Sequence, residues 1–298
     1  DMDLSYRAQL KGWEFIYLTD TVSPAELPVE MNSFKSQQFR WAKGSIQVAK
    51  KLLPTIMRSD VPRGVKWEAF FHLTNNFAYP LLLLLSLLLL PNLAVRTQHG
   101  WREVLLIDLP LFCGTTLSVI SFYIVSQREI GVPTGWPRLI YRLPLMLAVG
   151  IGLCINQTRA VFEALAGKET EFVRTPKHGV ANRRDKGWVG KRYRGAKTLI
   201  PLFELIMAGY FTFGLAVAIE GGHYISMPFL MLFFVGFLYV GAPSEQQTAK
   251  KGPPPPATLE ELSAPSRVSG RGGSAPPAAV RRRESGDRIH PTRVVGLL

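Results

Sequence analysis

The sequence contains an apolar run from Phe70 to Leu90 that has no Asp, Glu, Lys or Arg in it. About 20 such residues in a helix are enough to cross the hydrocarbon core of a bilayer, which is roughly 30 Å thick. Comparable runs extend from about Val104 to Val125, from Leu199 to Ile219 and from Tyr224 to Val240. The sequence therefore predicts an integral membrane protein with about four transmembrane helices.

The charged residues are segregated from these runs. The chain has 298 residues and a net charge of +13, and the stretches before residue 69 and between about 158 and 198 are basic. In a membrane protein such charge indicates cytoplasmic loops that face anionic lipid and phosphorylated substrate, and not a nucleic-acid footprint. The two cysteines, Cys113 and Cys154, lie in apolar segments without ligand spacing, so they imply neither a disulfide framework nor a metal cluster.

A shorter apolar run, from Leu143 to Ile155, decides the predicted topology. It is too short to cross a bilayer and follows Arg142, which favours an interfacial or re-entrant helix. The basic residues after it should stay in the cytoplasm, and they lie on the same side as Arg40 only if this run does not cross. We therefore expect four full spans and one interfacial helix.

Glu204 is the one carboxylate well inside the apolar runs. An acid within a membrane is a functional candidate, here one that lines a polysaccharide channel. Because it lies about one turn into its span, it could instead reach cytoplasmic water or a neighbouring base. Both interpretations stay open at this point.

The segment from Phe34 to Leu53 has no proline and one glycine, which favours a helix. Within it, spacings of three and four residues put Gln37, Arg40 and Trp41 on one face. Arg can hold phosphate oxygens in a bidentate way, Gln can bind hydroxyls or phosphate, and Trp offers an apolar surface to a sugar ring. The face therefore suits a sugar attached to a diphosphate, and the alternative is an amphipathic helix with a packed Trp and a snorkelling Arg.

The residues around this motif carry a family resemblance. The segment from Pro24 to Trp41, with its Glu26-Leu-Pro28 lead, resembles the one that precedes the membrane spans in processive family-two glycosyltransferases, such as cellulose, chitin, hyaluronan and glucomannan synthases. The mannan and glucomannan branch is the most similar. The resemblance implies that Arg40 and Gln37 contact the nucleotide diphosphate and that Trp41 forms the floor of the acceptor-sugar site.

The first residues carry a second part of the resemblance. Asp1 to Gly12 is expected to be a short helix and Trp13 to Leu18 a strand, which together are the end of an α/β domain. Asp1-Met-Asp-Leu-Ser-Tyr-Arg7 is similar to the family segment that begins with the catalytic aspartate. This makes Asp1 the counterpart of the general base, a role that suits a carboxylate near the attacking hydroxyl. The alternative is that Asp1 compensates a helix N-terminus.

A third match is the gating loop that follows the interfacial helix in this family. Its pattern Phe-x-Val-Thr-x-Lys resembles Phe172-Val-Arg-Thr-Pro-Lys177. Phe172, Thr175 and Lys177 match, while Arg174 stands where the pattern has valine. Arg174 and Lys177 are suited to neutralise a diphosphate leaving group, and the alternative is a basic surface loop.

The expected fold is mostly α-helical and membrane-integral, with about four transmembrane helices plus cytoplasmic interfacial helices, preceded by the helix and strand that end an α/β glycosyltransferase domain. The expected division is 1–33 for that domain end, 34–68 for interfacial helices with the motif, 69–127 for a transmembrane hairpin, 128–198 for the interfacial helix and gating loop, 199–241 for a second hairpin and 242–298 for a disordered tail.

The expected function is the membrane part of an inverting, processive hexosyltransferase. The partners would be a UDP- or GDP-hexose, a growing β-linked polysaccharide and the lipid bilayer, with no nucleic acid. The resemblance implies Mg²⁺ or Mn²⁺ bound by carboxylates that are not in this chain, so we expect the chain to be a fragment that is inactive alone. The expected location is the bacterial inner membrane, with the motif and gating loop cytoplasmic. The alternatives are a non-catalytic membrane subunit, a polysaccharide export channel, or a transferase that adds a single sugar.

Overall fold

The computed structural model describes residues 2–16, 23, 25–28, 30–96, 106, 109–129, 135–169, 198–249 and 280–282. Its elements, in chain order, are α1 (Met2–Leu10), β1 (Trp13–Phe15), α2 (Met31–Arg58), α3 (Arg63–Thr74), η1 (Asn75–Phe77), α4 (Ala78–Arg96), α6 (Leu109–Glu129), α7 (Gly135–Gly152), α8 (Cys154–Leu165), α9 (Ile200–Glu220), η3 (Tyr224–Ser226), α10 (Met227–Ala249) and β2 (Val280–Arg282). The predicted mostly helical, membrane-embedded fold is confirmed.

Three helical stretches among the described residues are long and apolar enough to cross a membrane. They are Arg63–Val95, which joins α3, η1 and α4, then Ile200–Glu220 and Tyr224–Ser244. They contain three of the four predicted spans. The fourth, from about Val104 to Val125, corresponds to α6 from Leu109 onward, and α6 is not among the three.

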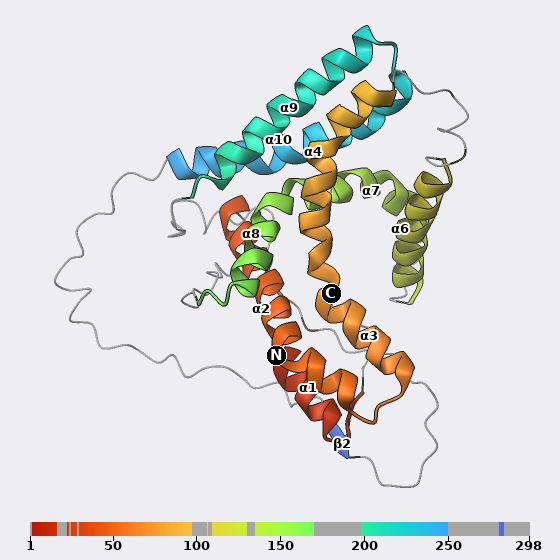
Figure 1. Cartoon of the computed structure of the whole chain (residues 1–298), viewed down its shortest axis with the longest axis vertical. Coiled ribbons are helices and arrows are strands. Elements are labelled where there is room, and N and C mark those ends of the chain that lie inside the picture. Colours follow the sequence, from red (N-terminus) through yellow and green to blue (C-terminus); the bar gives the residue numbers. More distant parts are fainter. Residues whose placement is uncertain are drawn as a thin grey trace, which may run out of the picture.

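The short run that decides the predicted topology is a bent helix pair. Tyr141–Gly152 and Cys154–Leu165 meet at 46°, which fits either a broken span or a re-entrant helix. In Figure 1, α7 and α8 follow one another around α4, and α8 turns to run beside α2. The bend separates an apolar half that packs on α10 from a polar half that packs on α2.

The apolar core is formed by α4, α7, α8, α9 and α10. Figure 1 shows α9 and α10 as an antiparallel hairpin with α4 crossing it. At the centre of the hairpin, the ring of Phe211 lies 5.1 Å from that of Phe233 and 5.9 Å from that of Phe237, measured between centroids. Leu93 and Leu230 extend the same buried cluster. This apolar packing gives α2 a rigid base to rest against.

Two boundaries differ from the expectation. Helix α10 continues to Ala249, past the expected hairpin end at residue 241, and buried Ser244 in this extension bonds with α2. The strand expected from Trp13 to Leu18 is three residues long, and it pairs antiparallel with β2 from the tail. Tertiary contacts that local sequence does not encode explain both differences.

Candidate functional site

The motif lies on α2, and α8 holds this helix by its backbone. The side-chain amide of Asn156 donates to the carbonyl oxygen of Lys35 at 3.0 Å, and that of Gln157 donates to the carbonyl oxygen of Gln38 at 3.1 Å. Asn156 and Gln157 are both buried. Two helix-to-helix hydrogen bonds therefore fix the turn of α2 that carries the start of the motif.

An ion-pair cluster joins the same two helices further along. Lys43 Nζ lies 3.0 Å from Glu163 Oε2, and Arg159 Nε lies 2.8 Å from Glu163 Oε1. Both cations also lie over the ring of Phe39, at 5.8 Å for Lys43 and 5.4 Å for Arg159. Lys43 and Arg159 thus each contact both the carboxylate of Glu163 and the ring of Phe39. Side chains of α8 therefore cover this side of α2.

The next side of α2 packs on α3. A buried apolar cluster contains Ala49, Leu52 and Ile56 from α2 together with Ala69 and Leu73 from α3. Burial of these side chains anchors α2 to the start of the first membrane-spanning stretch.

Helix α1 rests on α2 and α3 through polar contacts at its edges. The hydroxyl of Tyr6 lies 2.7 Å from Nδ1 of His72, and Lys51 Nζ lies 3.0 Å from Asp3. Burial raises the pKa of Tyr6 to about 12, and the hydrogen bond from Lys51 is the main cause that lowers the pKa of Asp3. Asp1, the predicted general base, lies outside the described residues, immediately before α1.

The motif residues lie on the side of α2 that α8 and α3 leave open. Trp41 is 57% exposed, while Gln37 and Arg40 are half-buried. One turn further, a Cβ built on Gly44 would meet no atom within 4 Å. The structure thus has a helix held from two sides, with an exposed indole beside a half-buried amide and a half-buried guanidinium, a set of groups able to hold a flat, partly anionic ligand.

The predicted gating residues Phe172, Arg174, Thr175 and Lys177 lie outside the described residues. The elements on either side of them are described. Helix α8 ends at Leu165, whose carbonyl oxygen accepts a hydrogen bond from Lys50 of α2 at 2.7 Å, and α9 also contacts α2.

One contact beside the motif was not assigned from sequence. Lys35 Nζ lies 2.7 Å from Glu204 Oε2, and the two side chains are 5% and 0% exposed. Burial lowers the pKa of Lys35, and the carboxylate of Glu204 opposes this effect. Of the interpretations left open for Glu204, the structure agrees with a neighbouring base. The only sequence feature that pointed to this contact was the position of Glu204, a single acid within an apolar run.

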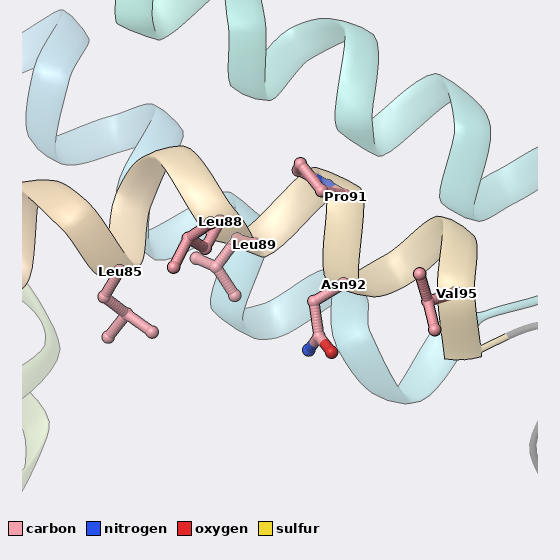
Figure 2. A pocket seen from close by; sticks show the side chains of 6 residues that line it. All are labelled: Leu85, Leu88, Leu89, Pro91, Asn92 and Val95. Atoms are coloured by element: carbon pink, nitrogen blue, oxygen red, sulfur yellow. The ribbon is translucent and has the colours of Figure 1, made fainter.

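A hollow of about 400 Å³ lies elsewhere, along α4. Figure 2 shows Leu85, Leu89 and Asn92 projecting from the same side of this helix. Its lining is apolar apart from Asn92, and it contains no motif residue. It is a groove of a membrane-spanning helix and not the candidate site.

The described residues contain no group of three or more His, Cys, Asp or Glu side chains placed to hold a metal ion. The expected Mg²⁺ or Mn²⁺ is therefore assigned no ligand from this part of the chain.

Comparison with known proteins gives a consistent set of relatives. Glucomannan 4-beta-mannosyltransferase 7 of Arabidopsis thaliana is 26% identical over 254 residues, which cover 81% of this chain and 42% of the relative. The chain is similar to plant glucomannan mannosyltransferases. Glucomannan 4-beta-mannosyltransferase 2 of the same plant is 29% identical over 185 residues, covering 60% of this chain and 32% of the relative. The resemblance expected from the motifs is confirmed.

The similarity is locally higher in one rice protein. Glucomannan 4-beta-mannosyltransferase 1 of Oryza sativa subsp. japonica is 40% identical over 77 residues, covering 26% of this chain and 14% of the relative. The chain spans less than half the length of these curated relatives. No family model matches the chain, and no solved structure matches it.

Proposed function

We propose that this chain is the membrane-embedded part of an inverting, processive glycosyltransferase. In this proposal the enzyme transfers hexose from a UDP- or GDP-sugar to the end of a β-linked polysaccharide and extrudes the polymer through its transmembrane helices. The names of the plant relatives make a mannosyl donor and a β-linkage to a 4-hydroxyl the first possibility to test.

The observation that carries the proposal is the accessible face of α2. Helices α8 and α3 occupy the other sides of α2 through buried contacts, while on the motif side Trp41 is exposed and a Cβ on Gly44 would meet no atom of the described residues within 4 Å. In the proposed mechanism Arg40 binds the diphosphate oxygens of the donor, and Gln37 binds a phosphate or a sugar hydroxyl. Trp41 supports the apolar face of the acceptor sugar. Because contacts with α8 and α3 hold the helix, its backbone need not be ordered on binding.

The remaining roles in the proposal come from the family resemblance. Asp1 takes the proton from the acceptor hydroxyl as that oxygen attacks the anomeric carbon. The nucleoside diphosphate leaves with the electron pair of the broken bond, which inverts the configuration at that carbon. In this mechanism Phe172, Arg174, Thr175 and Lys177 close over the nucleotide, and the two cations balance the charge that develops on the diphosphate. A divalent cation belongs to the complete enzyme, and no step above depends on it.

The proposal also includes the side of the membrane. Helix α2 and the basic loop face the cytoplasm, where nucleotide sugars are made available, and the polymer leaves on the other side. The helices that are long and apolar enough to cross a bilayer support a membrane location. The relatives named above are plant proteins, so they give no support to a bacterial inner membrane.

The test is synthesis by the complete gene product in lipid nanodiscs. Release of nucleoside diphosphate and incorporation of labelled sugar are measured with UDP- and GDP-hexoses, and the product is digested with linkage-specific β-mannanase and β-glucanase. Trp41→Ala is expected to lower polymer synthesis by about a hundredfold, because acceptor stacking positions the attacking hydroxyl.

The matched control is Trp67→Ala. Trp67 has the same exposed fraction as Trp41, 57%, but lies on α3, away from the motif. It is expected to leave synthesis within about twofold of wild type. Equal synthesis by wild type and Trp41→Ala would instead favour a non-catalytic subunit, and sugar-polymer transport without nucleotide-sugar consumption would favour an export channel.

A further inference from the structure

Three membrane-associated helices meet at a single lysine next to the motif. The ammonium group of Lys35 on α2 lies 2.7 Å from Glu204 Oε2 on α9 and 3.4 Å from the hydroxyl oxygen of Ser244 on α10. Asn32, one turn earlier on α2, donates from its amide to the carbonyl oxygen of Ser244 at 3.3 Å. The start of the motif helix is therefore attached to both arms of the hairpin.

The same residue also contacts the fourth helix of the region. The carbonyl oxygen of Lys35 accepts the hydrogen bond from Asn156 of α8. Lys35 thus connects α2 with α8, α9 and α10, two residues before Gln37. Since a helix rises 1.5 Å per residue, Trp41 stands only about 9 Å further along the axis. A shift of α2 along its axis at Lys35 would therefore move the motif with it.

The acid has no room to move away from this contact. Its side chain is fully buried, and a Cβ added at Gly241 of α10 would lie 3.0 Å from the Cβ of Glu204. Glycine at position 241 lets α10 approach α9 closely at this level. Glu204 is therefore enclosed between the two arms of the hairpin and the end of α2.

Stability alone does not explain the buried ion pair of Lys35 and Glu204. The second carboxylate oxygen of Glu204, Oε1, is buried and has no hydrogen-bond partner among the described residues. Apolar residues of similar volume often replace a buried ion pair without loss of stability, and the better-attested use of such polar pairs is to fix one register. The Lys35–Glu204 pair, with one carboxylate oxygen left without a partner among the described residues, lies where α2 meets the hairpin, which is where a register would be fixed.

We propose that Lys35 and Glu204 are positioning residues that set the register of the motif helix against the α9–α10 hairpin. The pair keeps the acceptor platform at Trp41 aligned with the path by which the polymer leaves between the helices. A slip of α2 by one residue would move the platform by about 1.5 Å and rotate it by about 100°. This inference rests on the proposed function, and it assigns the pair to product length and not to donor binding.

The test compares four forms of the complete gene product in nanodiscs: wild type, Glu204→Gln, the double variant Lys35→Met/Glu204→Met, and Tyr210→Phe. For each, the melting temperature, the KM for the donor and the mean product length per folded molecule are measured. Tyr210→Phe is the matched control, because it removes a hydrogen bond between α9 and α4 and leaves the contact of α9 with α2 in place.

Glu204→Gln is expected to shorten the product by about tenfold while the donor KM stays within about twofold. Glu204→Gln leaves the buried ammonium of Lys35 without its carboxylate and should lower the melting temperature, and the double variant should regain the melting temperature but not the product length. Tyr210→Phe should lower the melting temperature and leave product length unchanged. Wild-type product length in Glu204→Gln, or in the double variant, would overturn the inference.

A second readout does not depend on catalysis. Spin labels at Gln47 and Leu202, both exposed, report the distance between α2 and α9 after Cys113→Ser removes the exposed thiol. Glu204→Gln should broaden this distance distribution, and Tyr210→Phe should not. If wild type makes no polymer from any nucleotide sugar, the proposed function fails, whereas an unchanged distribution in Glu204→Gln rejects the positioning role.

Discussion

The hydroxyl of Tyr210 on α9 donates a hydrogen bond to the carbonyl oxygen of Leu87 on α4 at 2.7 Å. Pro91 stands four residues after Leu87 in the same helix and has no N–H to offer that carbonyl. In a membrane-spanning helix an unpaired carbonyl is costly, since no water is present to satisfy it. The hydroxyl of Tyr210 therefore takes the place of the N–H donor that Pro91 lacks.

Tyr210→Phe should accordingly destabilise the protein by about 1–3 kcal/mol, the typical cost of leaving a polar group away from water without its partner. Thermal unfolding in nanodiscs measures the loss. Tyr224→Phe is the control, because Tyr224 is 65% exposed and should change stability by less than about 0.5 kcal/mol. Equal melting of the two variants would show that the Leu87 carbonyl finds another donor.

The contact between α7 and α10 depends on two glycines. A Cβ on Gly236 would collide with the carbonyl oxygen of Ala148, and a Cβ on Gly152 would collide with the carbonyl oxygen of Gly236. Gly236→Ala should therefore force the helices apart and cost about 1–3 kcal/mol. The unfolding temperature in nanodiscs reports this loss.

Gly150→Ala provides the matched control for that prediction. Gly150 lies on the same helix as Gly152, and a Cβ built there would meet no atom within 4 Å. Because alanine is the better helix former, this variant should be neutral or more stable by up to about 1 kcal/mol. A loss as large as that of Gly236→Ala would contradict the close approach of α7 and α10.

The hydrogen-bonded, half-buried Tyr6 predicts a pH dependence. Its pKa is raised from 10.0 to about 12, mainly by burial and secondarily by the charge of Glu68. A folded-state pKa above the unfolded value gives stability that is complete below pH 10 and is lost as the pH rises toward 12. The attachment of α1 should therefore weaken in that window.

Ultraviolet difference titration of wild type against Tyr6→Phe isolates this phenol from the other tyrosines. A tyrosinate signal with a midpoint near 12 is expected. The variant should lose the stability change between pH 10 and 12. A midpoint at the ordinary value of 10.0 would show that Tyr6 is not buried at its contact with His72.

Arg40→Lys tests the chemistry assigned to the motif face. Lysine keeps the charge but cannot make two parallel hydrogen bonds to a diphosphate. The KM for the nucleotide sugar should rise by about tenfold, which corresponds to about 1.4 kcal/mol, with a smaller effect on product length. Gln47→Ala, an exposed change on the same helix, serves as control and should leave the KM unchanged. An unchanged KM in Arg40→Lys would remove the diphosphate from the proposed role of Arg40.

The sequence was sufficient to predict the features that depend on one continuous segment. Apolar length predicted Phe70–Leu90, Leu199–Ile219 and Tyr224–Val240, which overlap the three stretches long enough to span, because hydrocarbon thickness sets a minimum helix length. Proline-free spacing predicted the helix that carries Gln37, Arg40 and Trp41. The family resemblance rested in part on these residues, and the plant relatives confirm it.

Only the tertiary structure decided which distant residues meet. Lys35 and Glu204 are 169 positions apart, and Tyr210 is 123 positions from the carbonyl that it repairs. No local pattern marks such partners, because a buried polar group is satisfied by whichever helix packs against it. The sequence determined what each helix is and where it can lie, while packing determined which face of α2 stays open and what holds it there.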